Sequence, residues 1–311
     1  MAGGGVKRRV VLVGRFTSWL VKSITRRRVR GVYRGGFDLA AWRAFMVGMG
    51  KQARPPRDVR IEAVEEDGVR GSWFHPAEAN GKGRILYLHG GAFVAGSVHI
   101  YREFVGRLAA AAGLSTFSVE YRLAPEHPHP AALDDAEAAH AWLARQHDGP
   151  LVIAGDSAGG NLALTLLLRL RGTDQPMPAA AVVLSPVTDL TCRGASVDHN
   201  DAVDPLLHRS LAEATARLYL GDHDPADPAV SPLFADLSGF PPLLIQVGTD
   251  EILLDDARGL DARAREAGVE VTLSEWPGMM HDFHFAAMML AEGRQAYDEM
   301  GRFVRTHTHP A

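Results

Sequence analysis

The chain has 311 residues, of which 46% are hydrophobic and 23% are charged, a composition typical of a globular protein built on one large domain. Cys192 is the only cysteine, which excludes an intrachain disulfide and a thiolate metal cluster and fits a reducing compartment such as the cytoplasm. The net charge is −4, but residues 1–37 hold ten Lys or Arg and no acidic residue, so the remaining chain is strongly acidic.

The basic N-terminal segment has a helical pattern but does not resemble a membrane span. Residues 1–50 predict two helices, the second including 39–46. Arg15 and Lys22 interrupt the apolar residues of the first, which excludes a transmembrane helix and argues against a signal peptide. We expect this helix to pack its apolar stripe over the domain, and peripheral contact with an anionic membrane stays open. Nucleic-acid binding is not expected, because the basic charge is confined to this segment.

Short apolar runs then alternate with helical patterns along the rest of the chain. Alternating residues at 59–65 and 71–75 predict a β-hairpin. Six runs predict strands and four segments predict helices; the strands are 85–88, 114–119, 151–154, 180–184, 243–247 and 269–273, and the helices are 102–112, 131–146, 158–171 and 253–267. This rhythm predicts an α/β fold with a mostly parallel sheet and helices on both faces.

One interval, 186–241, is too long for a single crossover and holds one convincing helix, 210–220. We therefore expect cap helices at 1–50, a catalytic domain at 51–311, and a cap insertion at about 187–232.

Ser157 is the candidate nucleophile. It lies in Gly-Asp-Ser-Ala-Gly-Gly at 155–160, between a predicted strand and a predicted helix. Small residues around a serine at such a junction are typical of a nucleophile elbow, a strained turn that exposes the hydroxyl. The alternative for a lone Gly-x-Ser-x-Gly pattern is a serine that only caps the helix, and such a serine needs no partners.

His89-Gly90-Gly91-Ala92, directly after the strand 85–88, is the candidate oxyanion hole. Acyl transfer builds negative charge on a carbonyl oxygen, and backbone N–H groups are fixed donors for it. We assign the amides of Gly90, Gly91 and Ala92, together with that of Ala158, to this role. His89 is interpreted as an organiser of the loop, and Asp156 as support for the serine motif; the alternative is a plain turn.

The candidate acid and base follow the last two predicted strands. Asp250 comes just after 243–247, where open α/β sheets place ligands, and is positioned to orient an imidazole. The loop after 269–273 carries His281, with His284 as the fallback base. Three other carboxyl groups compete for the acid role: Asp204, in the presumed lid, and Asp255 and Asp256, which the start of the next helix accounts for.

These motifs resemble, as a set, the hormone-sensitive-lipase-like branch of the α/β-hydrolases. The set is His-Gly-Gly at 89–91, Tyr-Arg-Leu-Ala-Pro-Glu at 121–126 and the serine motif at 155–160, and the chain order is Ser, Asp, His. For 121–126 itself we expect a buried loop held by an Arg122–Glu126 pair. The resemblance implies an esterase with Ser157, His281 and Asp250 as nucleophile, base and acid, no cofactor or metal, and an N-terminal cap.

Two departures from that branch affect these expectations. Ala92 stands where the branch usually has a third glycine, and its methyl group is expected to narrow access for bulky alcohols. Glu251-Ile252 follow Asp250 where the branch often has Pro-Leu, which weakens the choice of acid.

We expect a small-molecule ester of short to medium acyl chain as the substrate. Amide or lactone cleavage uses the same residues and stays open, and a ligand-binding protein on a hydrolase scaffold is the alternative outside catalysis. Trp73, Phe93, Tyr101, Phe283 and residues 187–220 are candidates to shape the pocket. The predicted strand 269–273 offers an edge for a homodimer.

Overall fold

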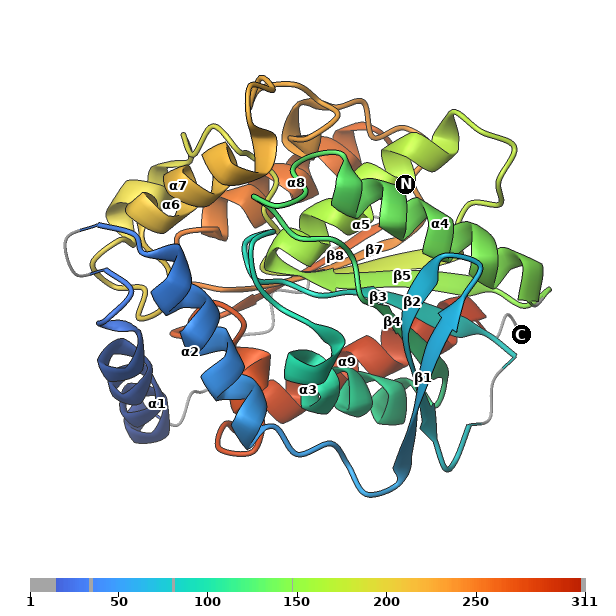
Figure 1. The fold of residues 1–311 in the computed structure, drawn as a ribbon, viewed down its shortest axis with the longest axis horizontal. Helices are drawn as coiled ribbons and strands as arrows, with labels where there is room; N and C mark the ends of the chain where they lie inside the picture. The colour runs from blue at the N-terminus through green and yellow to red at the C-terminus, as the bar shows by residue number, and fades with distance from the viewer. Residues whose placement is uncertain (1–14, 34–35, 80–81, 147, 309–311) are drawn as a thin grey trace, which may run out of the picture.

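The computed structural model describes residues 15–33, 36–79, 82–146 and 148–308 (Figure 1). An eight-stranded sheet has the order β1-β2-β4-β3-β5-β6-β7-β8. Its strands are β1 (Val59–Glu66), β2 (Val69–Pro76), β3 (Arg84–Leu88), β4 (Ser115–Val119), β5 (Leu151–Asp156), β6 (Ala180–Leu184), β7 (Leu243–Gly248) and β8 (Val271–Trp276). Strand β2 of the β1–β2 hairpin pairs antiparallel with β4, and the six strands β3 to β8 are parallel to one another. This confirms the predicted hairpin and α/β fold class.

Helices cover both faces of the sheet, as Figure 1 shows. They are α1 (Arg15–Val29), α2 (Leu39–Gln52), α3 (Val98–Ala112), α4 (Ala131–Gln146), α5 (Ser157–Arg171), α6 (Ala195–His199), α7 (Arg209–Leu220), α8 (Leu254–Glu266) and α9 (Ala291–Thr308), with short 3-10 turns η1 (Pro232–Phe234) and η2 (Phe283–Ala286). Helices α3 and α9 lie on one face, and α4, α5 and α8 on the other. The middle strands are therefore buried on both faces, which explains their unbroken apolar sequences.

The sequence misplaced the starts of two elements and missed a third element entirely. Helix α3 begins before the predicted residue 102, because the Ser97 side chain accepts a hydrogen bond from the Ile100 amide and caps it. Strand β8 begins at Val271 rather than 269, because the Val269 amide still bonds to Ala264 O at the end of α8 and Gly268 has a left-handed φ of 82°. The C-terminal helix α9 was not predicted.

Helix α1 packs against the body of the protein, at the left of Figure 1. Val21 joins an apolar cluster with Trp276, Met279 and Met280, while Trp19 is 61% exposed. Ser18 Oγ donates to the carbonyl oxygen of Gly278 at 3.2 Å, so the helix is bonded to the loop that follows β8. No helix in the described ranges is long and apolar enough to cross a bilayer. The division into cap and catalytic parts, and contact with a membrane, stay predictions.

Candidate active site

Ser157 lies at the sharp turn between β5 and α5. Its φ of 53° is in the left-handed region. Residues other than glycine adopt this conformation only when the surrounding structure holds them there. The glycines of the motif permit this turn, because a Cβ on Gly159 would overlap the carbonyl oxygen of Leu88 and one on Gly155 would overlap that of Gly159. Ser157 therefore has the strained geometry of a nucleophile elbow.

His281 meets Ser157 although 124 positions separate them in the chain. Its Nε2 lies 3.0 Å from Ser157 Oγ, and both side chains are buried. His281 is on the loop after β8, where Gly278 has a φ of 70° and lets the chain turn back toward the serine. The imidazole can therefore accept the serine proton directly. The fallback, His284, instead bonds through Nε2 to Gln246 Oε1 at 2.9 Å.

The acid at His281 is Glu251, and the assignment to Asp250 was wrong in geometry. Glu251 Oε2 lies 2.8 Å from His281 Nδ1, while its Oε1 accepts hydrogen bonds from Ser185 Oγ at 2.8 Å and Gly248 N at 2.6 Å. Asp250 points away and pairs with Lys22 Nζ at 2.5 Å. The two neighbouring carboxylates therefore have different partners, and only that of Glu251 bonds to the imidazole.

A signal for Glu251 was present in the sequence. Glu251 leads directly into the apolar run Ile252-Leu253-Leu254, all buried in the structure, whereas Asp250 follows the half-exposed Thr249. An acid at the start of a buried run faces the interior, and a buried carboxylate needs a partner.

The three other candidate carboxyl groups accept hydrogen bonds from backbone amides instead. Asp204 accepts from the amides of Leu206, Leu207 and Ile252. Asp255 and Asp256 lie in the first turn of α8, as expected, and also accept from amides of the segment 188–196.

One predicted oxyanion donor is already engaged. The Gly90 amide donates to Asp156 Oδ1 at 2.9 Å, which removes it from the hole and corrects that assignment. Within the described ranges the amides of Gly91 and Ala92 have no hydrogen-bond partner, and the Ala158 amide is in the first turn of α5, where N–H groups lack intrahelical acceptors. These three amides stay the predicted oxyanion hole. Ala92 has a φ of 60°, which explains why a glycine suits that position.

Buried aromatic side chains hold the loop that carries these amides. The His89 ring stacks on Tyr121 with ring centroids 4.2 Å apart and on Tyr101 at 5.3 Å, and Tyr121 Oη donates to His89 O at 2.5 Å. Burial lowers the pKa of His89 to about 4, so this ring is neutral near pH 7. Asp156 accepts from Tyr87 Oη at 2.5 Å and Tyr101 Oη at 2.9 Å. These contacts suit the predicted organising roles of His89 and Asp156.

The loop at 121–126 is not held by the expected internal pair. Arg122 bonds to Asp135 at 2.8 Å, and Glu126 bonds to Arg43 of α2 at 2.6 Å. Spacing within the motif could not reveal this, because Asp135 lies on the following helix, 13 positions away, and Arg43 lies 83 positions from Glu126.

Comparison with known proteins agrees with this geometry. Residues 85–285 match the family model described as alpha/beta hydrolase fold. An acetyl-hydrolase of Streptomyces hygroscopicus is 44% identical over 82% of this chain and 84% of its own length, and an esterase of Acinetobacter venetianus is 39% identical over 79% and 82%. A crystal structure of an esterase from the bacterial hormone-sensitive lipase family superposes with a TM-score of 0.89 at 38% identity, over 94% of this chain and 98% of the other.

The chain belongs to the α/β-hydrolase family. Its similarity to the hormone-sensitive-lipase-like branch confirms the predicted resemblance and the predicted enzyme class, a carboxylesterase. No group of three or more His, Cys, Asp or Glu among the described residues is arranged to hold a metal ion.

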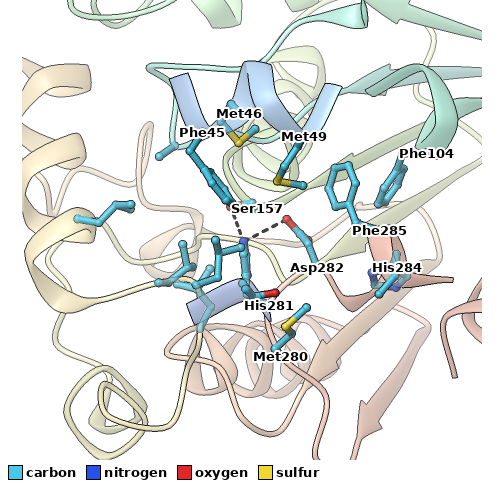
Figure 2. Close-up of a pocket in the computed structure, with 18 of the residues that line it drawn as sticks. Phe45, Met46, Met49, Phe104, Ser157, Met280, His281, Asp282, His284 and Phe285 are labelled. Carbon is cyan, nitrogen blue, oxygen red and sulfur yellow. Dashed lines mark hydrogen bonds and ion pairs between the residues drawn. The ribbon is translucent and has the colours of Figure 1, made fainter. Parts of the chain in front are cut away.

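The hydrolase has a cavity of about 330 Å³ at Ser157, shown in Figure 2. Helix α2 forms one wall with Phe45, Met46 and Met49. On the side of α3 and η2 the lining has Phe104, Phe285, Met288 and Met289 beside the charged Glu103 and Arg107. The side of the insertion is also mostly apolar and adds polar groups from Asp189, Cys192 and Thr215. Of the predicted pocket residues, Phe93 and Tyr101 line the cavity; Trp73 packs on Phe117 and Trp142, and Phe283 on Trp276.

Proposed function

We propose that this hydrolase cleaves short to medium acyl esters of small alcohols through a triad of Ser157, His281 and Glu251 and an acyl-enzyme intermediate. The observation that carries the proposal is the continuous chain of contacts from Ser157 Oγ to His281 Nε2, 3.0 Å, and from His281 Nδ1 to Glu251 Oε2, 2.8 Å. A serine, a base and an orienting acid in hydrogen-bond reach are what nucleophilic acyl transfer requires.

In the first step, Ser157 Oγ attacks the carbonyl carbon of the ester and its proton passes to His281 Nε2. The oxygen of the tetrahedral intermediate accepts hydrogen bonds from the amides of Gly91, Ala92 and Ala158. When the intermediate collapses, the bond from carbon to the alkoxy oxygen breaks, and the Nε2 proton moves to the departing alcohol. Glu251 holds the tautomer with a proton on Nδ1 and stabilises the imidazolium between these transfers.

In the second step, water replaces the alcohol. His281 Nε2 takes one proton from the water as its oxygen attacks the acyl carbon, and returns that proton to Ser157 Oγ when the acid leaves. The enzyme therefore ends each turnover in its starting protonation state.

Two relatives support an ester with a short acyl group, because one carries the name acetyl-hydrolase and the other the name esterase. Amide hydrolysis is the second candidate, since an acetyl group can be attached to nitrogen as well as oxygen. Hydrolysis of a matched acetyl ester and acetyl amide separates the two, and we expect faster turnover of the ester. Labelling of Ser157 by a fluorophosphonate, followed by intact mass, tests the nucleophile; an unlabelled folded protein would contradict the proposal.

A bulky substitution in α2 tests the position of the acyl chain. Met49→Trp is expected to lower kcat/KM about tenfold for an octanoate ester and less than twofold for an acetate ester, because the added ring fills the apolar side of the cavity formed with Phe104 and Phe285. A series of 4-nitrophenyl esters of increasing chain length measures this.

Val47→Trp is the matched control for that experiment. Val47 lies on the same helix and is 49% exposed, so the chain-length profile should stay that of the wild type. An equal loss for all esters in Met49→Trp would place the acyl chain elsewhere.

A further inference from the structure

A second acidic side chain touches the atom of His281 that must accept the serine proton. Asp282 Oδ2 lies 3.1 Å from His281 Nε2, next to the 3.0 Å contact of the same nitrogen with Ser157 Oγ. Figure 2 shows both contacts converging on this nitrogen. Asp282 is only 5% exposed and lines the cavity, so water screens this contact little. The triad just proposed has no role for this carboxylate.

Backbone geometry holds Asp282 in this position. Its φ is 49°, in the left-handed region, directly before the short turn η2. Among residues other than glycine, Asp and Asn tolerate this conformation best. The carboxylate therefore reaches the imidazole of its own neighbour in the chain, which an extended backbone would direct to the opposite side.

Asp282 also faces the buried carboxyl group of Asp156, at the end of β5. Burial raises the pKa of Asp156 well above its usual range, and the adjacent Asp282 raises it further. The carboxyl group of Asp156 is therefore favoured in its neutral form.

The groups that face His281 are mostly acidic. They are Glu251 after β7, Asp282 on its own loop and Asp204 after α6; His284 of η2 is also near, and burial lowers its pKa to about 4. Burial alone would lower the pKa of His281, but Asp282 first, and then Glu251, outweigh burial and raise the pKa well above 6.5. The charged imidazolium is thus favoured between two carboxylates.

We propose that Asp282 is a further catalytic residue that holds the Nε2 proton of His281 in the resting enzyme, so that the base is released only under alkaline conditions. The proposal rests on His281 being the base. An imidazolium whose Nε2–H donates to Asp282 has no lone pair for the serine proton. Loss of that one proton to solvent frees Nε2, and Ser157 can then be activated. The acid limb of kcat/KM therefore lies above the range of an ordinary histidine.

Two substitutions remove the charge while suiting the left-handed backbone. In Asp282→Asn and Asp282→Gly the midpoint of the acid limb is expected to fall by about one pH unit or more, because one of two stabilising carboxylates is gone. The measurements are kcat/KM for an acetate ester and the rate at which a fluorophosphonate labels Ser157, each from pH 5 to 10. Asp250→Asn is the matched control, because Asp250 pairs with Lys22; its midpoint should not move.

The outcomes separate this inference from the proposed triad. Unchanged midpoints in both Asp282 variants would overturn it and leave the triad intact. If the wild type showed neither labelling nor hydrolysis at any pH, the proposed triad itself would be contradicted. If circular dichroism shows that neither variant folds, the wild type decides: a midpoint at or below about 6.5, the ordinary value for histidine, overturns the role of Asp282, and a higher midpoint supports it.

Discussion

Ser157→Ala is expected to lower kcat/KM for an acetate ester by roughly five to six orders of magnitude, because without Oγ no acyl-enzyme can form. The cavity and the predicted oxyanion amides stay in place, so hydrolysis by bound water sets the lowest value to which kcat/KM can fall. Alanine adopts the left-handed φ of 53° no more easily than serine does, so the elbow should keep its strain and thermal stability should change little. Burst-phase kinetics with a 4-nitrophenyl ester would show the loss directly: the burst should vanish.

Ser118→Ala is the matched control for this substitution. Ser118 is buried in β4 and its hydroxyl has no hydrogen-bond partner among the described residues, so its removal should leave kcat/KM within a factor of two. Activity of Ser157→Ala close to that of the control would show that another group is the nucleophile.

Glu251→Gln is expected to lower kcat by about three to four orders of magnitude, while KM changes little. The glutamine amide can donate to Nδ1 of His281, which leaves the ring proton on Nε2, the nitrogen that must be free to accept the serine proton. Because glutamine has nearly the size and shape of glutamate, the decrease in kcat comes from the changed tautomer of His281 and the lost negative charge. Steady-state kinetics near the pH optimum measure it.

Asp250→Asn is the comparison that separates the two adjacent acids. Its carboxylate is paired with Lys22, so we expect kcat within about threefold of the wild type and a small loss of thermal stability from the broken ion pair. If Asp250→Asn instead abolished turnover and Glu251→Gln did not, the acid assignment would return to Asp250.

The sequence predicted those parts of the site that follow directly from strand ends. Ser157 and His281 both come from loops after buried strands of the parallel sheet, and such loops meet at one edge. The choice between Asp250 and Glu251 was beyond this logic, because it depends on which of two neighbouring side chains a turn directs inward. The Gly90 amide was misassigned for a similar reason: its acceptor, Asp156, is 66 residues away in the chain.

Contacts between helices and loops that are distant in sequence also could not be predicted. The pairs Arg43–Glu126 and Lys22–Asp250 join N-terminal helices to loops of the body, and no spacing pattern connects them. Asp282 was overlooked because its position in sequence, next to the base, says nothing about the left-handed backbone that turns its carboxylate toward Nε2.

Helix α1 lies outside the segment matched by the family model, 85–285, and is nevertheless bonded to loops of the site. Lys22 and Ser18 connect this one helix to two segments of the site, the turn that carries Glu251 and the loop that carries His281. A shortened protein that starts at residue 85 would retain every reacting group and still lose this common tether, together with the cavity wall of α2. Natural variation or engineering in α1 and α2 should therefore change turnover numbers, although the predicted reacting groups all lie after residue 84.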